Sequence, residues 1–145
     1  MNWPLDLVIV MLGTNDMKAR YRAEAAEIAE GARTLVKAIR RLHREVHPDW
    51  MPRILLLSPL LIGEKLRDGL SGFSESFGGE RAYRISRELA PLYRKVAEEE
   101  QCWFLDAACA ASVGCVDALH LEEEGHRDLA AAMEQKVREI FRSVQ

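Results

Sequence analysis

Two short groups of residues near opposite ends of the chain carry side chains suited to acid–base chemistry and to binding an oxyanion. Gly13-Thr14-Asn15-Asp16 follows the apolar run Leu5–Leu12, and Asp117-Ala118-Leu119-His120 precedes the last predicted helix. Gly13 permits a tight turn, and the amide of Asn15 can donate a hydrogen bond to a developing oxyanion. Asp117 can accept from one imidazole nitrogen of His120, which leaves the other nitrogen free as a general base. The two groups therefore predict a site for general-base catalysis.

Each group also has a purely structural interpretation. In the first group, Asn15 or Asp16 caps backbone groups in the turn that follows the strand. In the second group, Asp117 caps a turn and His120 is an ordinary surface residue. A D-x-x-H spacing is common by chance, so either group taken alone leaves both interpretations open.

Strands and helices alternate along the chain. The apolar segments Leu5–Leu12, Arg53–Leu57 and Cys102–Leu105 are predicted to be buried strands. Apolar residues recur at helical spacing in three further stretches: Ile28, Leu35, Ile39, Leu42 and Val46; Ala82, Ile85, Leu89, Leu92 and Val96; and Leu129, Met133, Val137 and Ile140. This order predicts a parallel sheet with right-handed crossovers, in which ligands bind beyond the carboxyl ends of the strands. Both polar groups follow strands and are expected to meet at that edge.

Proline and glycine set the expected limits of these elements. The first helix should end near His47-Pro48, because the residue before a proline disfavours the α conformation. Pro91 is expected to kink or break the second helix. Gly63–Gly79 is predicted to be a long loop, a feature that is usually functional in a compact domain. Three aromatic side chains either line an acyl or aryl pocket there or anchor the loop to the core: Phe73, Phe77 and Tyr83.

Composition excludes several classes of protein. At 145 residues, the chain 1–145 is expected to form a single domain. Its net charge of −3, with both signs interleaved, argues against nucleic acid binding. No apolar run approaches the length of a membrane span, and Met1–Pro4 lacks the pattern of a signal peptide. A cytoplasmic protein is therefore expected.

The residues that most often bind metals give no complete site. Cys102, Cys109 and Cys115 fit no metal or redox spacing and are expected to be reduced and packed. His43 and His47 are four positions apart on a predicted helix, but no third ligand is indicated, and a solvated helix end is the better interpretation. No metal or other cofactor is expected.

The two polar groups resemble the G-x-N-D and D-x-x-H blocks of the SGNH (GDSL) hydrolases. The segment Leu5–Lys18 and the Ser58-Pro59 loop especially resemble their arylesterase and acetyl-esterase branch. The resemblance implies a three-layer α/β/α, flavodoxin-like fold with a parallel sheet. It implies a serine ester hydrolase that acts on a small-molecule ester through an acyl-enzyme and needs no cofactor. By this resemblance Gly13 and Asn15 are oxyanion-hole residues, Asp117 is the orienting acid and His120 is the base.

One part of the family pattern is missing. The family carries its nucleophilic serine in a Gly-Asp-Ser block on an earlier strand, and this chain is expected to start after that block, as an N-terminally truncated, C-terminal two thirds of the domain. A replacement nucleophile among Ser71, Ser74 and Ser76 would lack rigid support. The chain alone is therefore expected to be inactive. The alternative is a non-catalytic remnant that mediates dimerisation or partner binding, and the Leu5–Leu12 strand edge is the predicted homodimer contact.

Overall fold

A parallel, three-stranded sheet forms the centre of the computed structural model, which describes residues 4–142. The strands β1 (Leu7–Val10), β2 (Arg53–Ser58) and β3 (Trp103–Asp106) lie in the order β1-β2-β3, with β2 hydrogen-bonded to both neighbours. The parallel direction of the strands agrees with the prediction from sequence. Residues 1–3, which include most of the segment that lacks a signal-peptide pattern, lie outside the described part of the chain.

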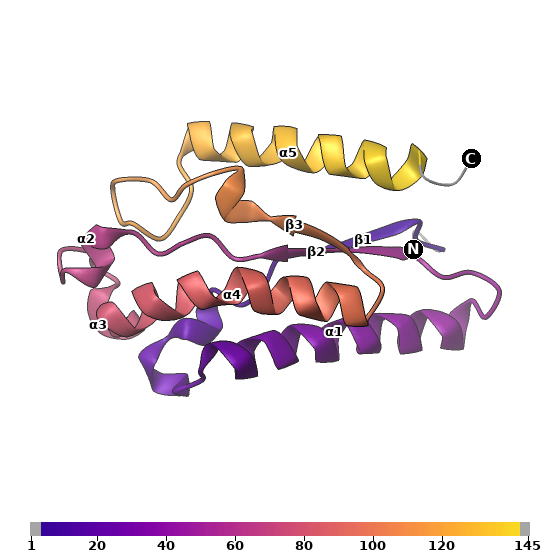
Figure 1. Ribbon diagram of the computed structural model, residues 1–145, viewed down its shortest axis with the longest axis horizontal. Helices are drawn as coiled ribbons and strands as arrows, with labels where there is room; N and C mark the ends of the chain where they lie inside the picture. Colours follow the sequence, from indigo (N-terminus) through magenta and orange to yellow (C-terminus); the bar gives the residue numbers. More distant parts are fainter. Residues whose placement is uncertain (1–3, 143–145) are drawn as a thin grey trace.

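Helices cover both faces of the sheet. Figure 1 shows α1 (Ala25–Val46) and α4 (Glu80–Glu99) on one face and α5 (Glu123–Arg142) on the other. Side chains alternate between the two faces, as expected for strands: Leu56 of β2 packs into the cluster under α1 and α4, whereas Leu55 packs into the cluster under α5. The expected three-layer α/β/α fold is confirmed.

Local sequence signals explain the limits of α1. The Glu24 side chain accepts from the third helical backbone N–H, and Glu27 reaches back to the N–H of Glu24, which forms a capping box. The helix ends at Val46, directly before His47-Pro48, as predicted. Ile28 and Val36 lie on its buried face. The helix therefore has a defined start, a defined end and one face committed to the core.

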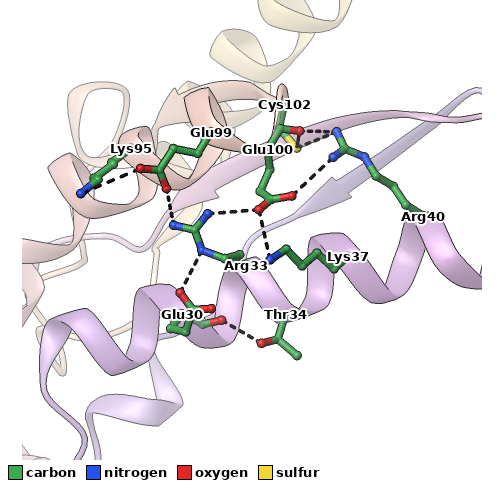
Figure 2. Close-up of polar contacts among 9 residues, drawn as sticks. All are labelled: Glu30, Arg33, Thr34, Lys37, Arg40, Lys95, Glu99, Glu100 and Cys102. Atoms are coloured by element: carbon green, nitrogen blue, oxygen red, sulfur yellow. Dashed lines mark hydrogen bonds and ion pairs between the residues drawn. The ribbon is translucent and has the colours of Figure 1, made fainter.

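An ion-pair network joins α1 to the C-terminal end of α4 (Figure 2). Arg33 of α1 contacts Glu30 of the same helix and both Glu99 and Glu100 beyond it. Lys37 lies 3.6 Å from the carboxylate of Glu100, whose side chain is only 13% exposed. Several charges in a partly buried network stabilise more than isolated surface pairs do. The network therefore fixes the position of α1 relative to α4.

The predicted break at Pro91 and the predicted plain loop at Gly63–Gly79 are both wrong. Helix α4 runs unbroken through Pro91, because Leu89 and Tyr93 on either side of the proline are buried in the core and their packing offsets the cost of about 3 kcal/mol. Gly63–Gly79 is not a plain loop, because it contains the short helices α2 (Glu64–Arg67) and α3 (Ser74–Phe77). Leu66 and Phe77 anchor these helices in the core.

Two predictions about possible metal-binding residues also need correction. His43 is not part of a solvated helix end, since it is 1% exposed, donates from Nδ1 to the Trp50 carbonyl at 2.9 Å and accepts from the Leu5 N–H. Cys109 and Cys115 are exposed rather than packed, because both lie in the irregular segment after β3 or at its edge. All the cysteines are unpaired, as expected.

The outer edge of β1 is open. Within residues 4–142 β1 has β2 as its one strand neighbour, and α5 packs mainly on β3. Ile9, which points to the α5 side, is consequently 39% exposed, and Leu12 is 58% exposed. Every helix of the described residues is too short or too polar to cross a lipid bilayer.

Candidate active site

Asp117 and His120 form the polar centre of the segment before α5. Oδ2 of Asp117 lies 2.6 Å from Nδ1 of His120. Oδ1 of the same carboxylate accepts from the backbone N–H groups of Leu119 and His120, both at 2.9 Å. One carboxylate oxygen therefore caps the turn while the other contacts the imidazole, a geometry that is compatible with both interpretations of this group.

The electrostatics of this pair favour an ionised carboxylate. Burial acts to raise the pKa of Asp117, but hydrogen bonds from the backbone and imidazole of His120 and from the Leu119 N–H outweigh burial and lower that pKa to about 2. An ionised Asp117 holds the proton on Nδ1 of His120 and leaves Nε2 as the basic nitrogen. The His120 side chain is 65% exposed, and within residues 4–142 its Nε2 makes no hydrogen bond. A base with an open approach results.

The backbone of this segment is held in a strained shape. Ala118 adopts a left-handed conformation with φ of 60°, which is rare for a residue that carries a side chain. Its carbonyl accepts from the Gly63 N–H at 3.0 Å, and its N–H donates to Gly114 at 3.2 Å. The Gly114 N–H donates in turn to the His120 carbonyl at 2.7 Å. These bonds fix the turn that brings Asp117 and His120 together.

The three candidate aromatic residues separate into different roles. The Phe73 ring lies 5.4 Å from the His120 ring in an edge-on arrangement, whereas Phe77 is 1% exposed and belongs to the core. Tyr83 contacts the Arg87 guanidinium, 3.3 Å from the ring centroid. Phe73 is therefore the aromatic residue beside the histidine. It also lines a cavity of about 550 Å³ with Lys18, Ala19, Arg20, Gly72, Glu75 and Ser76.

The Gly13 turn is shaped by a buried tyrosine. The Tyr93 hydroxyl donates to the Leu12 carbonyl at 2.9 Å, and burial raises the pKa of this phenol. Gly13 has φ of 120°, and a Cβ there would lie 2.3 Å from the Tyr93 oxygen. Only glycine adopts this φ without strain and also leaves room for the Tyr93 oxygen. Tyr93 and Gly13 together direct the chain from β1 into the short 3-10 helix η1 (Asn15–Met17).

The side chain of Asn15 is exposed at the start of η1. No side chain caps η1, so the capping interpretation of Asn15 and Asp16 does not describe this turn. Within residues 4–142 the Asn15 side chain makes no hydrogen bond, including none to Asp117 or His120. Its amide is therefore available to a ligand.

The two polar groups adjoin the same large apolar cluster. Met17, which follows Asn15, is buried in the same apolar cluster as Phe77, Ala118 and Leu119. The 3-10 helix η2 (Ala19–Tyr21) packs against α3, which follows Phe73. The first group follows β1 and the second follows the segment after β3, so both lie beyond the carboxyl ends of parallel strands.

The serine hydroxyls near this site are engaged elsewhere. Ser58 donates to Asp106 at 2.9 Å, and Ser71 donates to the Asp117 carbonyl at 2.6 Å. Three further serines bond locally: Ser74 accepts from the Ser71 N–H, Ser76 donates to the Phe73 carbonyl and Ser86 donates to the Tyr83 carbonyl. Within residues 4–142 the Ser112 hydroxyl makes no hydrogen bond. In the part of the chain that the structure describes, no serine hydroxyl is hydrogen-bonded to His120. Among the same residues no group of three or more His, Cys, Asp or Glu side chains is arranged to hold a metal ion.

Comparison with known proteins finds a family and solved structures to which this chain is similar. Residues 2–127 match the model of the GDSL-like lipase/acylhydrolase family. A carbohydrate acetylesterase from Sinorhizobium meliloti superimposes with a TM-score of 0.84 at 34% identity, over 96% of this chain and 63% of that one. An aryl esterase from M. smegmatis gives a TM-score of 0.82 at 34% identity, over 95% of this chain and 62% of that one. A comparison with curated proteins found no match.

A more distant similarity concerns the fold alone. An acetylxylan esterase from Geobacillus stearothermophilus gives a TM-score of 0.63 at 20% identity, over 91% of this chain and 59% of that one. The chain therefore spans about 60% of the length of the solved structures that it matches. The candidate base and the Asn15 turn both lie within the matched residues.

Proposed function

We propose that this chain, which belongs to the GDSL-like lipase/acylhydrolase family of SGNH hydrolases, supplies the base and the oxyanion donor of a serine ester hydrolase. The observation that carries the proposal is the 2.6 Å contact between Asp117 Oδ2 and His120 Nδ1, with Nε2 left open. This is the arrangement that an acyl-transfer enzyme needs in its base.

The proposed reaction passes through an acyl-enzyme. Nε2 of His120 takes the proton from a serine hydroxyl as the serine oxygen attacks the ester carbonyl, and Asp117 stabilises the imidazolium that forms. Asn15 donates to the oxyanion, next to the backbone of Gly13. His120 then returns the proton to the departing alcohol, and water releases the acyl group by the same steps. No metal or other cofactor takes part.

The nucleophilic serine is proposed to come from a Gly-Asp-Ser block, a sequence that the 145 residues do not contain. The hydroxyl protons of Ser58, Ser71 and Ser76 are already donated to carboxylate or carbonyl oxygens, which disfavours each of them as a substitute. The 145-residue chain by itself is therefore proposed to be inactive.

The proposed substrate is a small-molecule ester with an acyl or aryl group. Support comes from the similar structures, which are an aryl esterase and a carbohydrate acetylesterase, and from the Phe73 ring beside His120. An aromatic ring next to the base gives the acyl or aryl group an apolar contact. Nucleic acid and membrane partners are not part of the proposal.

The test compares the 145-residue chain with a longer chain that adds a Gly-Asp-Ser block ahead of β1. We expect the short chain to give negligible turnover of p-nitrophenyl acetate and no labelling by a fluorophosphonate. Loss of the nucleophile leaves a triad enzyme only about 10³–10⁴-fold above the uncatalysed reaction. The longer chain should gain both activities, and His120→Ala should abolish its turnover. Stoichiometric labelling of one serine in the short chain would contradict the proposal.

A second candidate function is homodimerisation through the β1 edge, without catalysis. It is favoured by the open side of β1, where Ile9 and Leu12 are exposed, and by Leu35 of the neighbouring α1, which is 39% exposed. Unpaired strand groups beside apolar side chains favour pairing with another strand, and a two-fold dimer closes that edge.

Light scattering at micromolar concentration distinguishes this candidate. A dimer that Ile9→Lys dissociates supports it. Leu61→Lys is the matched control, because Leu61 is 37% exposed and lies after β2 rather than on the β1 edge. A stable monomer of the unaltered chain would exclude it.

A further inference from the structure

We propose that Ser71 is a positioning residue for the Asp117–His120 pair. Its buried hydroxyl joins the main chain of Asp117 to the residue whose ring contacts His120. The inference rests on the proposed function, in which His120 is the base. It assigns to Ser71 a role other than that of nucleophile.

One hydroxyl connects two segments that are far apart in the sequence. Ser71 Oγ–H donates to the Asp117 carbonyl at 2.6 Å, and Ser71 Oγ accepts from the Phe73 N–H at 3.2 Å. The Phe73 ring then lies 5.4 Å from the His120 ring, inclined at 73°. The Ser71 hydroxyl therefore bonds both the main chain of Asp117 and the main chain of Phe73, the residue whose ring contacts His120.

Ser71 is itself rigidly held. It is 8% exposed, its N–H donates to Ser74 Oγ at 3.2 Å, and its carbonyl accepts from the Ser74 N–H at 3.0 Å. The last two bonds tie Ser71 to the first residue of α3. A support that is fixed in this way can hold a neighbouring loop within the narrow tolerance that catalysis needs.

The segment that Ser71 holds is one that needs support. The Asp117 carbonyl belongs to the peptide group that precedes Ala118, the residue with the left-handed conformation. Ser71 fixes this peptide group, and the Gly63 N–H fixes the next one through the Ala118 carbonyl. A strained residue persists only where its surroundings determine its shape. The N–H side of the peptide group that Ser71 fixes is bonded to the Gly114 carbonyl. Without the Ser71 hydroxyl, the carbonyl side is released and the contact between Oδ2 and Nδ1 weakens.

The same geometry argues against Ser71 as a nucleophile. A nucleophilic serine donates its proton to the base, whereas the proton of Ser71 is donated to a backbone carbonyl. The hydroxyl is also buried against that carbonyl, away from solvent. Ser71 therefore acts on the reaction through Asp117 and His120.

The imidazole tautomer of His120 gives a direct test that does not depend on turnover. Nitrogen-15 NMR of the whole 145-residue chain is recorded at a pH where the imidazole ring is neutral. It reports which ring nitrogen carries the remaining hydrogen. His120→Ala assigns the signals. We expect the unaltered chain to hold the proton on Nδ1. Ser71→Ala and the nearly isosteric Ser71→Cys should raise the population protonated on Nε2 several-fold.

Two variants separate positioning from a general effect on folding. Ser71→Thr retains the hydroxyl and should keep the tautomer ratio of the unaltered chain. Ser76→Ala is the matched control, because Ser76 lies nearby in α3 and donates to the Phe73 carbonyl but is exposed and does not bond Asp117. It should leave the tautomer unchanged.

The outcomes distinguish this inference from the proposed function. An unaltered chain without the Nδ1–H tautomer would remove the basis for His120 as the oriented base, and with it the proposed function. An oriented imidazole that persists in Ser71→Ala and Ser71→Cys would overturn only the role of Ser71. Failure of both variants to fold, with Ser71→Thr folded, would make Ser71 a structural residue and would also overturn the inference.

Discussion

The two polar groups of the candidate site are held in different ways. In the Asp117 segment, both carboxylate oxygens are bonded and the surrounding backbone is tied to Gly63, Ser71 and Gly114. In the Gly13 turn, Tyr93 fixes the backbone, while the Asn15 side chain is exposed and makes no hydrogen bond within residues 4–142. The proposed base is therefore positioned down to its side-chain atoms, whereas the proposed oxyanion donor is positioned only as far as its main chain.

This difference fits the order in which the two groups would act. A base must hold one tautomer before substrate arrives, because its free nitrogen has to face the nucleophile. An oxyanion donor interacts with charge that exists only during the reaction, so its amide has no partner beforehand. The following predictions test the contrast, beginning with the largest expected effect on stability.

Substitution at the Gly13 turn should have the largest effect. Gly13→Ala introduces a Cβ that would lie 2.3 Å from the Tyr93 oxygen and 3.1 Å from Pro59 Cγ, on a backbone with φ of 120°. We expect a loss of about 3 kcal/mol or more in the free energy of unfolding, from steric overlap and backbone strain together. Urea denaturation measures this loss.

Gly72→Ala is the matched control for that measurement. A Cβ at Gly72 would have no heavy atom within 4 Å, and its φ lies outside the left-handed range. The expected change is a gain or loss of less than about 1 kcal/mol. Equal losses for the two variants would mean that the close approach of Tyr93 to Gly13 does not constrain the turn.

The carboxylate of Asp117 should contribute a pH-dependent part of the stability. Its pKa is about 2 when folded and 3.8 in the reference state, so its contribution is present above about pH 4 and is lost as the pH falls toward 2. Asp117→Asn should therefore lower the free energy of unfolding by roughly 1–2 kcal/mol at neutral pH and by much less near pH 2. Urea denaturation at both pH values measures the difference.

Asp128→Asn serves as the control, because Asp128 is exposed on α5 and makes no hydrogen bond or ion pair in the described part of the chain. This substitution should leave the free energy of unfolding unchanged at both pH values. A loss for Asp117→Asn that is equally large near pH 2 would show that the site depends on the shape of the side chain rather than on its charge.

The hydroxyl of Tyr93 should contribute a smaller amount. Tyr93→Phe removes the 2.9 Å bond to the Leu12 carbonyl but keeps the buried ring, and we expect a loss of about 1 kcal/mol. Thermal denaturation measures this loss, with Tyr21→Phe as the control. Tyr21 is exposed, so its hydroxyl should contribute less than about 0.5 kcal/mol. If the two variants match, the buried hydrogen bond does not hold the strand end.

The smallest effect on stability is expected at Asn15. Asn15→Ala should change the free energy of unfolding by less than about 0.5 kcal/mol, because the exposed side chain makes no internal bond. In a chain completed with the nucleophile, the same change should lower kcat by about 10²–10³-fold. Asn15→Asp, which keeps the shape but removes the donor, should be at least as impaired. A loss of stability above about 1 kcal/mol would assign Asn15 a structural role instead.

Some of the site was predictable because the relevant interactions are local. Asp117 and His120 are three positions apart, so a single turn can bring the carboxylate to the imidazole, and the structure shows that contact. The end of α1 depends on Pro48 and was predicted in the same way, whereas its start at the Glu24–Glu27 capping box was not predicted. The failures came where packing overrides local preference, as at Pro91 inside α4 and at His43 beneath the sheet.

The sequence itself determined the alternation of parallel strands and helices along the chain and the spacing of Asp117 and His120. Each depends on periodicity or on neighbours within one turn. Only the tertiary structure decided the supports of the site. Ser71 meets Asp117 across 46 positions, and Tyr93 meets Leu12 across 81. A serine and a tyrosine carry no local signal of such partners. Their contacts exist because the packing of α4 against η1 and the sheet, and of the α2–α3 segment against the loop before α5, brings these atoms together.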